Sequence, residues 1–273
     1  MSKKSILITG CSSGIGYDTA HYLYKNGYKV YASARDAKDV KRLQDEGLDA
    51  YVLDVTNADD ISKVLSEITK DGAELYAVFN NAGYGQAGAV EDITTEVLKE
   101  QFETNFFGLH ELTRQAIKIM RKQGYGRIIQ HSSVLGIISL RFRGAYNASK
   151  YAIEGLCDTL RLELMESDIY VCTINTGPVR SDFRKNAIKM FKKNVVSERS
   201  VFEKEYNEEL LSVKEKNNDL FTKNSDVVIK NILHALEAKK PKLRYYNTFA
   251  THLLGGFKRV LPTRILDKVL RKI

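Results

Sequence analysis

Short hydrophobic runs alternate with longer amphipathic stretches along this 273-residue chain. Each run has the length of a buried strand, and the stretches between the runs repeat apolar residues at helical spacing. Strands separated by helices form βαβ units, whose strands pair in parallel. We predict seven strands, over residues 5–9, 29–34, 50–54, 76–80, 126–132, 170–175 and 243–246. The pattern predicts a single α/β domain over residues 1–273, with a doubly wound parallel sheet and helices on both faces.

A long helix is predicted over residues 94–122, and a second one follows the fifth strand and ends near residue 166. Asn105 lies near the middle of the first helix, among the apolar residues Phe102, Phe106 and Leu109. A polar side chain on an apolar helix face needs a buried hydrogen-bond partner. We therefore expect Asn105 to be hydrogen-bonded inside the protein.

A glycine-rich turn, Gly10–Gly16 (GCSSGIG), connects the first strand to a helix that ends near residue 26. Glycines let the backbone approach a ligand closely, and the amide groups of a helix N-terminus face an anion. The spacing differs from the commoner Gly-x-Gly-x-x-Gly pattern, and turns need glycine for other reasons as well. The position between a strand and a helix favours a phosphate cradle.

The residues that end the second and third strands bear on the choice of nucleotide. In dinucleotide-binding folds an acid after the second strand binds the ribose 2′-hydroxyl, whereas a nearby Arg accommodates a 2′-phosphate. Arg35 ends this strand, and Asp36 fits better as the N-cap of the next helix. Arg35 therefore favours NADP over NAD, the alternative being a solvated surface arginine. Asp54 ends the third strand, where it can accept a hydrogen bond from adenine or cap the following segment beside Thr56 and Asn57.

The net charge of +8 is concentrated at one end of the chain. Residues 239–273 contain ten Lys or Arg and one Asp, so this tail carries +9 and the rest of the chain −1. A nucleic-acid enzyme would carry its positive charge along a binding face of the body. We expect no nucleic-acid partner.

Cysteine use and hydropathy predict a cytoplasmic protein. Cys11, Cys157 and Cys172 are scattered and lack metal-ligand spacing, which predicts reduced thiols and no metal site. No apolar run reaches the length of a membrane span, and we expect no signal peptide. A content of 43% hydrophobic residues with three prolines excludes a disordered or fibrous class.

Tyr146 and Lys150 are the first candidates for chemistry. Their spacing of four residues places them on one face of a helix. A nearby ammonium is expected to lower the tyrosine pKa from about 10, which suits a general acid or base. Ser133 could hold an oxygen of the reacting group, and Ser132 is expected to point the other way because neighbours in a strand alternate faces. Alone, such a Tyr-Lys pair is more often a contact on a helix surface.

Several motifs, in order over residues 5–181, resemble those of the short-chain dehydrogenase/reductase family. Thr9–Gly16 (TGCSSGIG) resembles the family's TGxxxGxG cofactor loop, and Asn80–Gly83 (NNAG) matches the motif that supports the sheet and borders the adenine. Gly177–Ser181 (GPVRS) resembles the segment that lines the nicotinamide, with Ser181 where Thr is more usual. The motifs are most similar to those of the hydroxysteroid and retinol dehydrogenase branch. The resemblance implies a single-domain Rossmann fold, with residues 5–181 as its cofactor and catalytic core.

The resemblance also implies hydride transfer between nicotinamide C4 and a carbonyl or alcohol carbon, with Asn105, Ser133, Tyr146 and Lys150 as the catalytic residues. Tyr146 is then the general acid or base, and Lys150 depresses its pKa and binds the nicotinamide ribose. Ser133 bonds the substrate oxygen, and Asn105 holds a water that links Lys150 to solvent. The implied cofactor-binding residues are Gly10, Ser12, Ser13, Gly14, Ile15, Gly16, Arg35, Asp54, Val55, Asn81, Ala82, Gly83, Tyr146, Lys150, Gly177, Pro178, Val179 and Ser181. The substrate pocket, by position, comprises Tyr84, Ser133, Leu135, Phe142 and Phe183.

Two segments beyond this core have open interpretations. In the family the region of residues 184–224 covers the substrate site, so we predict a mobile helical lid over a large apolar pocket; the alternative is a solvated insertion. The basic tail, residues 239–273, has two helical patches around Pro262, the second of them amphipathic. A basic amphipathic helix can make peripheral contact with an anionic membrane, or pack its apolar face on its own or a neighbouring subunit. We favour packing.

These observations predict an NADP(H)-dependent oxidoreductase that transfers a hydride between nicotinamide and a carbonyl or secondary alcohol. The expected substrate is apolar, such as a steroid, a retinoid, or a fatty or aromatic ketone, and NAD is the less favoured cofactor. The alternatives are a non-catalytic NADP(H)-binding sensor and a membrane-surface-associated scaffold that uses the basic tail. By analogy with the family, we expect a homodimer or homotetramer.

Overall fold

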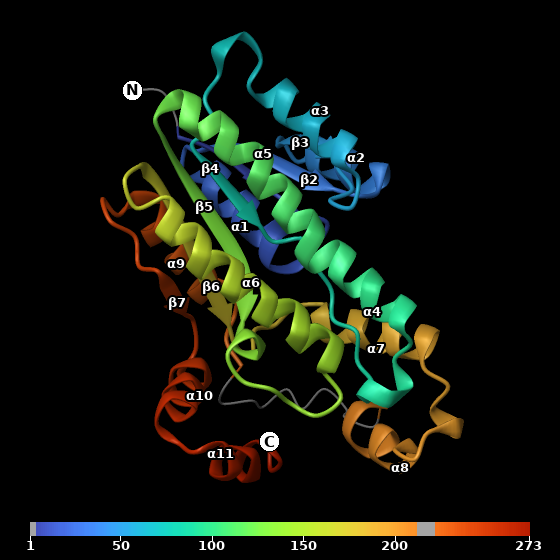
Figure 1. Ribbon diagram of the computed structural model, residues 1–273. Coiled ribbons are helices and arrows are strands. Elements are labelled where there is room, and N and C mark those ends of the chain that lie inside the picture. The colour runs from blue at the N-terminus through green and yellow to red at the C-terminus, as the bar shows by residue number, and fades with distance from the viewer. Residues whose placement is uncertain (1–3, 212–221) are drawn as a thin grey trace.

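A seven-stranded parallel sheet forms the centre of the computed structural model, which describes residues 4–211 and 222–273 (Figure 1). The strands follow the order β3-β2-β1-β4-β5-β6-β7, and every neighbouring pair is parallel. Their bounds are β1 Ser5–Ile8, β2 Lys29–Ala34, β3 Asp49–Val52, β4 Ala77–Asn80, β5 Tyr125–Ser133, β6 Asp168–Thr176 and β7 Arg244–Tyr246. All seven predicted strands are present, so the predicted α/β fold is confirmed. The strand order reverses between β1 and β4, which is where such sheets bind ligands.

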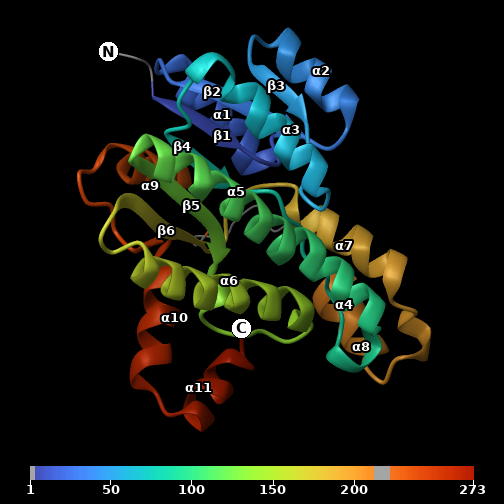
Figure 2. The same cartoon turned by 45° about the horizontal axis from the view of Figure 1, so that its top comes forward.

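Helices pack on both faces of the sheet, as Figure 2 shows. The first face carries α1 (Gly14–Lys25), α2 (Ala37–Asp45) and α9 (Asp226–Glu237). The second carries α3 (Ala58–Ile68), α5 (Gly108–Gln123) and α6 (Gly144–Glu163). Because both faces are covered, the inner strands β1 and β4 are buried at every position. This burial explains why their sequences are mostly apolar, without the alternation of a half-exposed strand.

The helix predicted over residues 94–122 is one helical run with a widened turn inside it. It consists of α4 (Thr95–Phe102), a π-helical turn (Glu103–Phe107) and α5. The Thr94 side chain caps the run by accepting a hydrogen bond from the Val97 amide at 3.3 Å. Such π-turns are frequent at functional sites, and this one contains Asn105.

The segment predicted as a lid forms a packed helical unit in its described part. It consists of α7 (Phe183–Asn194), a 3₁₀ turn (Ser197–Arg199), α8 (Glu203–Glu205) and a π-helical turn (Tyr206–Leu211). Tyr206 is fully buried, packs against Phe142 and Phe191, and accepts a hydrogen bond from the Ala89 amide at 2.7 Å. These contacts argue against a solvated insertion. Residues 212–221 of the predicted lid lie outside the described residues.

The basic tail contributes the edge strand and two helices, α10 (Phe249–Val260) and α11 (Thr263–Leu270). Leu254 and Leu270 join a hydrophobic cluster with Val134 and Ile138, and Leu266 is buried. Part of the apolar face of α11 therefore packs on the protein itself, as we favoured. Short 3₁₀ turns complete the fold, over Lys70–Gly72, Val90–Asp92 and Val134–Gly136. Among the described helices, none combines the length and the hydropathy needed to cross a membrane.

Candidate active site

The glycine-rich turn after β1 is shaped by close backbone contacts. Gly10 has a φ of 71°, which disfavours other residues, and a Cβ there would lie 2.8 Å from the Cα of Ala82. A Cβ on Gly16 would lie 2.4 Å from the carbonyl oxygen of Gly10. At the N-cap of α1, Ser13 makes no side-chain capping bond. The first amides of α1 therefore have no capping side chain and can receive an anion.

A cavity of about 340 Å³ opens at the carboxyl ends of β1 to β5, beside this turn. This volume is within the range of small-molecule sites. The residues that line it are Gly10, Ser12, Ser13, Gly14, Ile15, Ala34, Arg35, Leu53, Asp54, Val55, Asn81, Ala82, Gly83, Tyr84, Thr104, His131, Tyr146, Lys150, Ser181, Asp182, Phe183 and Asn186. Most of the predicted cofactor residues thus lie around one cavity.

Four of the predicted cofactor residues are not part of this lining: Gly16, Gly177, Pro178 and Val179. Gly16 lies behind the turn, against Gly10. Gly177 is packed under α10, where its Cβ would meet the hydroxyl of Thr248 at 2.2 Å. Pro178 and Val179 pair with Lys223 through the backbone. These residues support the cavity wall from outside.

The ends of β2 and β3 arrange their polar residues in different ways. Asp36 caps α2 by accepting a hydrogen bond from the Lys38 amide at 2.8 Å, which confirms its predicted capping role. Arg35 is exposed beside the cavity, and within the described chain no hydrogen bond or ion pair holds its guanidinium. Asp54 accepts hydrogen bonds from the amide and hydroxyl of Thr56, at 2.9 and 2.8 Å. Asp54 thus stabilises the turn, while Asn57 caps α3.

Arg42 is a neighbour of the glycine-rich turn that sequence reasoning missed. It lies on α2, and its Nη2 donates to the carbonyl oxygen of Ser12 at 2.6 Å. The guanidinium also lies 5.3 Å from the centre of the Tyr17 ring. Arg42 therefore ties α2 to the turn, and only the three-dimensional packing reveals this contact.

Tyr146 and Lys150 lie one helical turn apart on the buried face of α6, and both line the cavity. The Nζ atom of Lys150 lies 5.6 Å from the centre of the Tyr146 ring and donates to the carbonyl oxygen of His131 at 2.6 Å. Ser133 is within hydrogen-bonding reach of the Tyr146 hydroxyl, and its Oγ donates to the carbonyl oxygen of Thr176 at 3.3 Å. The Ser132 hydroxyl is buried on the other side, close to Gly136. The alternation of strand β5 thus brings Ser133, and not Ser132, to the tyrosine.

The protonation of this pair differs from the expectation. Burial raises the pKa of Tyr146 to about 12, and the hydrogen bond from Ser133 opposes the shift. Burial also lowers the pKa of Lys150 to about 8, opposed by the charge of Glu154. The expectation that the tyrosine pKa lies below its usual value is wrong in this structure, because desolvation outweighs the neighbouring groups. Tyr146 therefore holds its proton at neutral pH.

Asn105 is fully engaged with the segment after β4. Its Oδ1 accepts from the Tyr84 amide at 3.0 Å, and its Nδ2 donates to the Tyr84 carbonyl oxygen at 2.9 Å and to the Ser149 hydroxyl at 3.2 Å. The expected buried partners are therefore present. Because Ser149 directly precedes Lys150, Asn105 connects the π-helical turn to α6.

His131 is a second residue that sequence reasoning missed, although a signal was present. It lies two positions before Ser133 on β5, and residues two apart in a strand share a face. Its Nδ1 bonds the Oδ1 of Asn81 at 2.8 Å, and its Nε2 bonds the hydroxyl of Thr176 at 2.9 Å. Its carbonyl oxygen accepts a hydrogen bond from the Nζ atom of Lys150. His131 thus links β4, β6 and α6.

The hydrogen bonds around His131 determine its tautomer. The Asn81 amide nitrogen already donates to the carbonyl oxygens of Thr9 and Gly10, so its Oδ1 must accept from His131. Thr176 accepts from the Asn247 amide at 3.0 Å, so its hydroxyl proton is available to the Nε2 of His131. One neutral imidazole, with its proton on Nδ1, satisfies both contacts. Burial and the charge of Lys150 lower the pKa of His131 to about 3.

Comparisons with known proteins agree with this geometry. A family model described as short chain dehydrogenase matches residues 4–191, which is more than half of the chain. The chain belongs to the short-chain dehydrogenase/reductase family.

Relatives of the chain include members of this family with a range of names. It is 37% identical over 271 residues to "Uncharacterized oxidoreductase YbbO" of Escherichia coli, which covers 98% of this chain and 94% of the relative. Human retinol dehydrogenase 8 is 33% identical, over 66% of this chain and 60% of its own length. Human 17-beta-hydroxysteroid dehydrogenase type 1 is 29% identical, over 91% of this chain and 78% of its own length. A crystal structure of a short-chain dehydrogenase from Streptomyces avermitilis matches with a TM-score of 0.76 at 25% identity, over 98% of this chain and 94% of that one. The predicted resemblance, including its branch, is confirmed.

Replacing His131 with Leu in this short-chain dehydrogenase/reductase is expected to lower the free energy of unfolding by about 1–3 kcal/mol at pH 8, because Asn81 and Thr176 lose a buried partner. The difference in the free energy of unfolding between the wild type and the variant should shrink as the pH falls. The folded protein keeps His131 neutral down to a pKa of about 3, whereas the unfolded chain binds the proton below about 6.5. The wild type therefore loses this contribution between those two values, and the variant does not. Urea denaturation across this range measures both effects, and parallel pH profiles would contradict the neutral state of His131 in the folded protein.

The predicted substrate residues divide between the cavity and its surroundings. Tyr84 and Phe183 line the cavity, and the Phe183 ring lies 5.1 Å from that of Tyr146. Ser133, Leu135 and Phe142 are not among its lining residues. Leu135 packs in the cluster with α10, and Phe142 lies in the buried cluster with Tyr206. The structure thus brings only part of the predicted pocket to the cavity.

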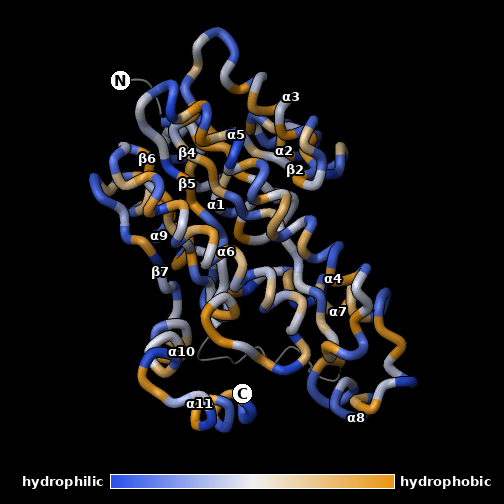
Figure 3. The backbone as a smooth tube through the Cα atoms, in the orientation of Figure 1, coloured by the Kyte–Doolittle hydropathy of each residue, from blue (hydrophilic) through white to orange (hydrophobic). Residues whose placement is uncertain are grey.

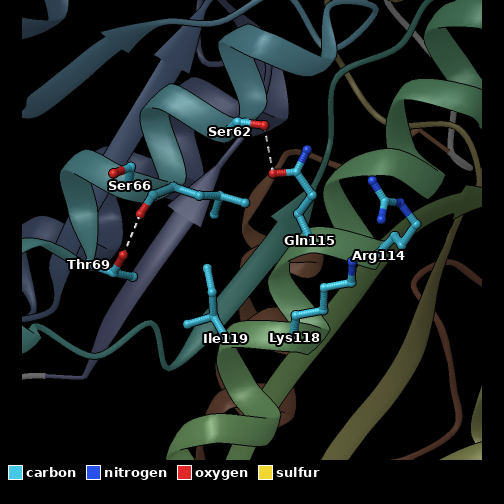
Figure 4. Close-up of a pocket in the computed structure, with 8 residues that line it drawn as sticks. Ser62, Ser66, Thr69, Arg114, Gln115, Lys118 and Ile119 are labelled. Carbon is cyan, nitrogen blue, oxygen red and sulfur yellow. Dashed lines mark hydrogen bonds between the residues drawn. The ribbon is translucent and has the colours of Figure 1, made fainter.

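A second cavity of about 340 Å³ lies between α3 and α5 (Figure 4). Ser62 and Gln115 bond across it at 3.1 Å, and Arg114 and Lys118 border it. Its lining contains no carboxylate, histidine or cysteine, so it has no group suited to acid-base chemistry at neutral pH. Among the residues that the structure describes, no cluster of three His, Cys, Asp or Glu could hold a metal.

Proposed function

We propose that this protein is an NADP(H)-dependent oxidoreductase that transfers a hydride between nicotinamide and the carbonyl or secondary-alcohol carbon of an apolar substrate. The observation that carries the proposal is the position of Tyr146 and Lys150 in the cavity that the glycine-rich turn and Arg35 also line. Family membership supports the reaction type. The cofactor fits the residues present, since Ser13 makes no side-chain capping bond to the amides of α1 and, among the described residues, Arg35 forms no hydrogen bond or ion pair.

When bound, the nicotinamide cofactor supplies or accepts the hydride. Tyr146 keeps its proton at neutral pH and is placed to donate it to a substrate oxygen during reduction. Ser133, bonded to the tyrosine, would hold the same oxygen. Lys150 is mostly protonated at neutral pH, and its charge stabilises the negative charge that develops on Tyr146. The binding of a water by Asn105 stays a prediction.

Arg35 is the residue on which the preference for NADP depends. A charge-assisted contact to a 2′-phosphate should make NADPH bind about 10–100-fold more tightly than NADH. ElxO, a solved protein of the same fold at 23% identity and a TM-score of 0.72, has NADP bound. Arg35→Ala should remove most of the preference and leave the affinity for NADH unchanged. Titration with each cofactor, followed by its fluorescence, measures this.

Arg121→Ala is the matched control for this titration, because Arg121 is an exposed arginine at the far end of α5. It should bind both cofactors like the wild type. Equal binding of NADPH and NADH by the wild type would contradict the proposed role of Arg35, but not the proposed enzyme. Binding of neither cofactor would contradict the proposed enzyme itself.

The apolar substrate is supported by the aromatic residues at the cavity. Tyr84 and Phe183 line the cavity, the Phe183 ring packs on that of Tyr146, and α7 borders this side through Phe183 and Asn186. Two relatives are named for retinol and for a hydroxysteroid. A steroid, a retinoid, and a fatty or aromatic ketone are therefore the first substrates to assay. A non-catalytic sensor gains no support, since it would not need Tyr146, Ser133 and Lys150 in one arrangement.

The proposal keeps two further expectations. The cytoplasm stays the predicted location; Cys11, Cys157 and Cys172 are all buried and unpaired, which suits a reducing environment. A homodimer or homotetramer also stays predicted, and the exposed apolar residues Phe107, at the end of the π-helical turn, and Leu162, on α6, are consistent with a subunit interface.

A further inference from the structure

Helix α10 leaves a stripe of apolar residues uncovered. Phe249, Leu253 and Val260 are 65%, 41% and 80% exposed. With the exposed Gly256 between them, they follow the spacing of one helix face. The opposite face packs on the protein through Leu254. The sequence pattern had drawn attention to α11, whereas the structure shows that the longer uncovered stripe is on α10.

Helix α11 extends the same kind of surface. Ile265 and Ile273 are exposed, while Leu266 and Leu270 pack inward. Figure 3 shows hydrophobic and hydrophilic residues mixed along both helices. We refer to residues 249–273 as the C-terminal helix pair.

The C-terminal helix pair is also strongly basic. It contains one acid, Asp267, and six exposed cations: Lys258, Arg259, Arg264, Lys268, Arg271 and Lys272. Among the described residues none of these cations forms an ion pair, whereas Lys and Arg elsewhere in the chain do so repeatedly. The surface therefore combines uncovered apolar side chains with unneutralised positive charge.

We propose that the C-terminal helix pair docks on the surface of an anionic lipid bilayer. Helices that lie in a membrane interface combine an apolar face with Lys and Arg at its border. Anionic headgroups would neutralise the cations while the apolar stripe enters the interface. A second copy of this chain would bring the same cations together, and like charges across an interface disfavour association.

The position of the helix pair relates docking to the candidate active site. Leu254, Phe257 and Leu270 pack on the loop that follows Ser133. Thr248 and Thr251 contact Gly177, at the end of β6. The helix pair lies at the end of the molecule toward which the strands point (Figures 1 and 2). Docking would turn this end toward the lipid, from which an apolar substrate would arrive; this last point rests on the proposed function, and the docking does not.

Co-sedimentation of the full chain with vesicles tests the proposal. One set of vesicles contains phosphatidylcholine alone, and the other contains phosphatidylcholine and phosphatidylglycerol in equal parts. We expect binding to the anionic vesicles that weakens as salt is added, and little binding to the neutral ones. Absence of binding to the anionic vesicles at low salt would overturn the proposal.

Two variants and one control separate docking from general stickiness. Lys258→Gln with Arg259→Gln should reduce the partition coefficient about 10-fold or more, since each cation near the surface contributes about 1 kcal/mol. Phe249→Gln with Leu253→Gln should cause a comparable loss. The control is Arg121→Gln with Lys122→Gln, an adjacent basic pair in the last turn of α5, as Lys258 and Arg259 are in the last turn of α10. It should bind like the wild type.

Light scattering of the same proteins completes the test. Each variant should keep the mass and the cofactor affinity of the wild type, which shows that it is folded. A lower mass of the Phe249 and Leu253 variant would mean that a second copy covers the stripe, and would overturn the proposal. Equal loss of vesicle binding in the control would also overturn it, because the charge alone would then explain binding.

Discussion

Replacing Tyr146 with Phe is expected to lower kcat by about 10²–10⁴-fold, the usual contribution of a general acid or base. The tyrosine is buried, and its ring packs against Phe183 at 5.1 Å. Phe fills the same space, so the variant should fold and bind NADPH as the wild type does. What it loses is the hydroxyl, which bonds Ser133 and keeps its proton at neutral pH. The measurement is kcat with the carbonyl compound that the wild type reduces fastest.

Tyr151→Phe is the matched control for this variant. Tyr151 is on the same helix, but it is partly exposed and its hydroxyl donates to the carbonyl oxygen of Ile137, away from the cavity. Its removal should leave kcat unchanged. If Tyr146→Phe kept a tenth or more of the wild-type rate, another group would have to supply the proton. A loss of NADPH binding in this variant would instead point to a structural role.

The fold was predictable because local pattern and tertiary structure agree. The runs that became β1 and β4 are buried at every position and mostly apolar, because helices cover both faces of the sheet. The π-helical turn was not predictable, because Asn105 bonds to Tyr84 and Ser149 on other elements. An amphipathic repeat predicts that a helix forms, and tertiary contacts decide where it widens.

The site was predictable where a motif fixes the backbone and less so where packing decides. The glycine-rich turn, Tyr146 and Lys150 all line the cavity. The pKa of Tyr146 was predicted in the wrong direction, because a spacing of four residues says nothing of burial. Phe142 was placed in the pocket by position, yet it packs on Tyr206, whose contact across 64 residues no local pattern contains.

The largest effect on stability is expected at Arg244, which connects the edge strand β7 to α6. Its Nε donates to Glu154 at 2.9 Å, and its Nη2 donates to both carboxylate oxygens of Asp158, at 2.6 and 2.7 Å. Glu154 is buried and also accepts from the Asn175 amide at 2.6 Å. It lies one turn after Lys150 on α6, so the network holds the helix that carries the proposed chemistry.

Arg244→Leu should lower the free energy of unfolding by about 3–5 kcal/mol, because it leaves the carboxylate of Glu154 buried without its ion-pair partner. Urea denaturation measures the change. The free energy of unfolding of Arg244→Lys should lie between those of Arg244→Leu and the wild type. A lysine ammonium cannot contact Glu154 and bridge both oxygens of Asp158 at the same time.

Arg161→Leu is the control, since Arg161 bonds the same Asp158 at 2.7 Å but does not reach Glu154. A partly exposed ion pair contributes about 1 kcal/mol or less, so this variant should stay close to the wild type. Comparable losses in Arg161→Leu and Arg244→Leu would contradict the argument, because the effect would then lie in Asp158 and not in the buried Glu154. A large loss of stability in Arg244→Leu but not in Arg161→Leu would show that β7 stabilises the sheet through one buried charge. A pattern of apolar residues cannot predict such a contribution.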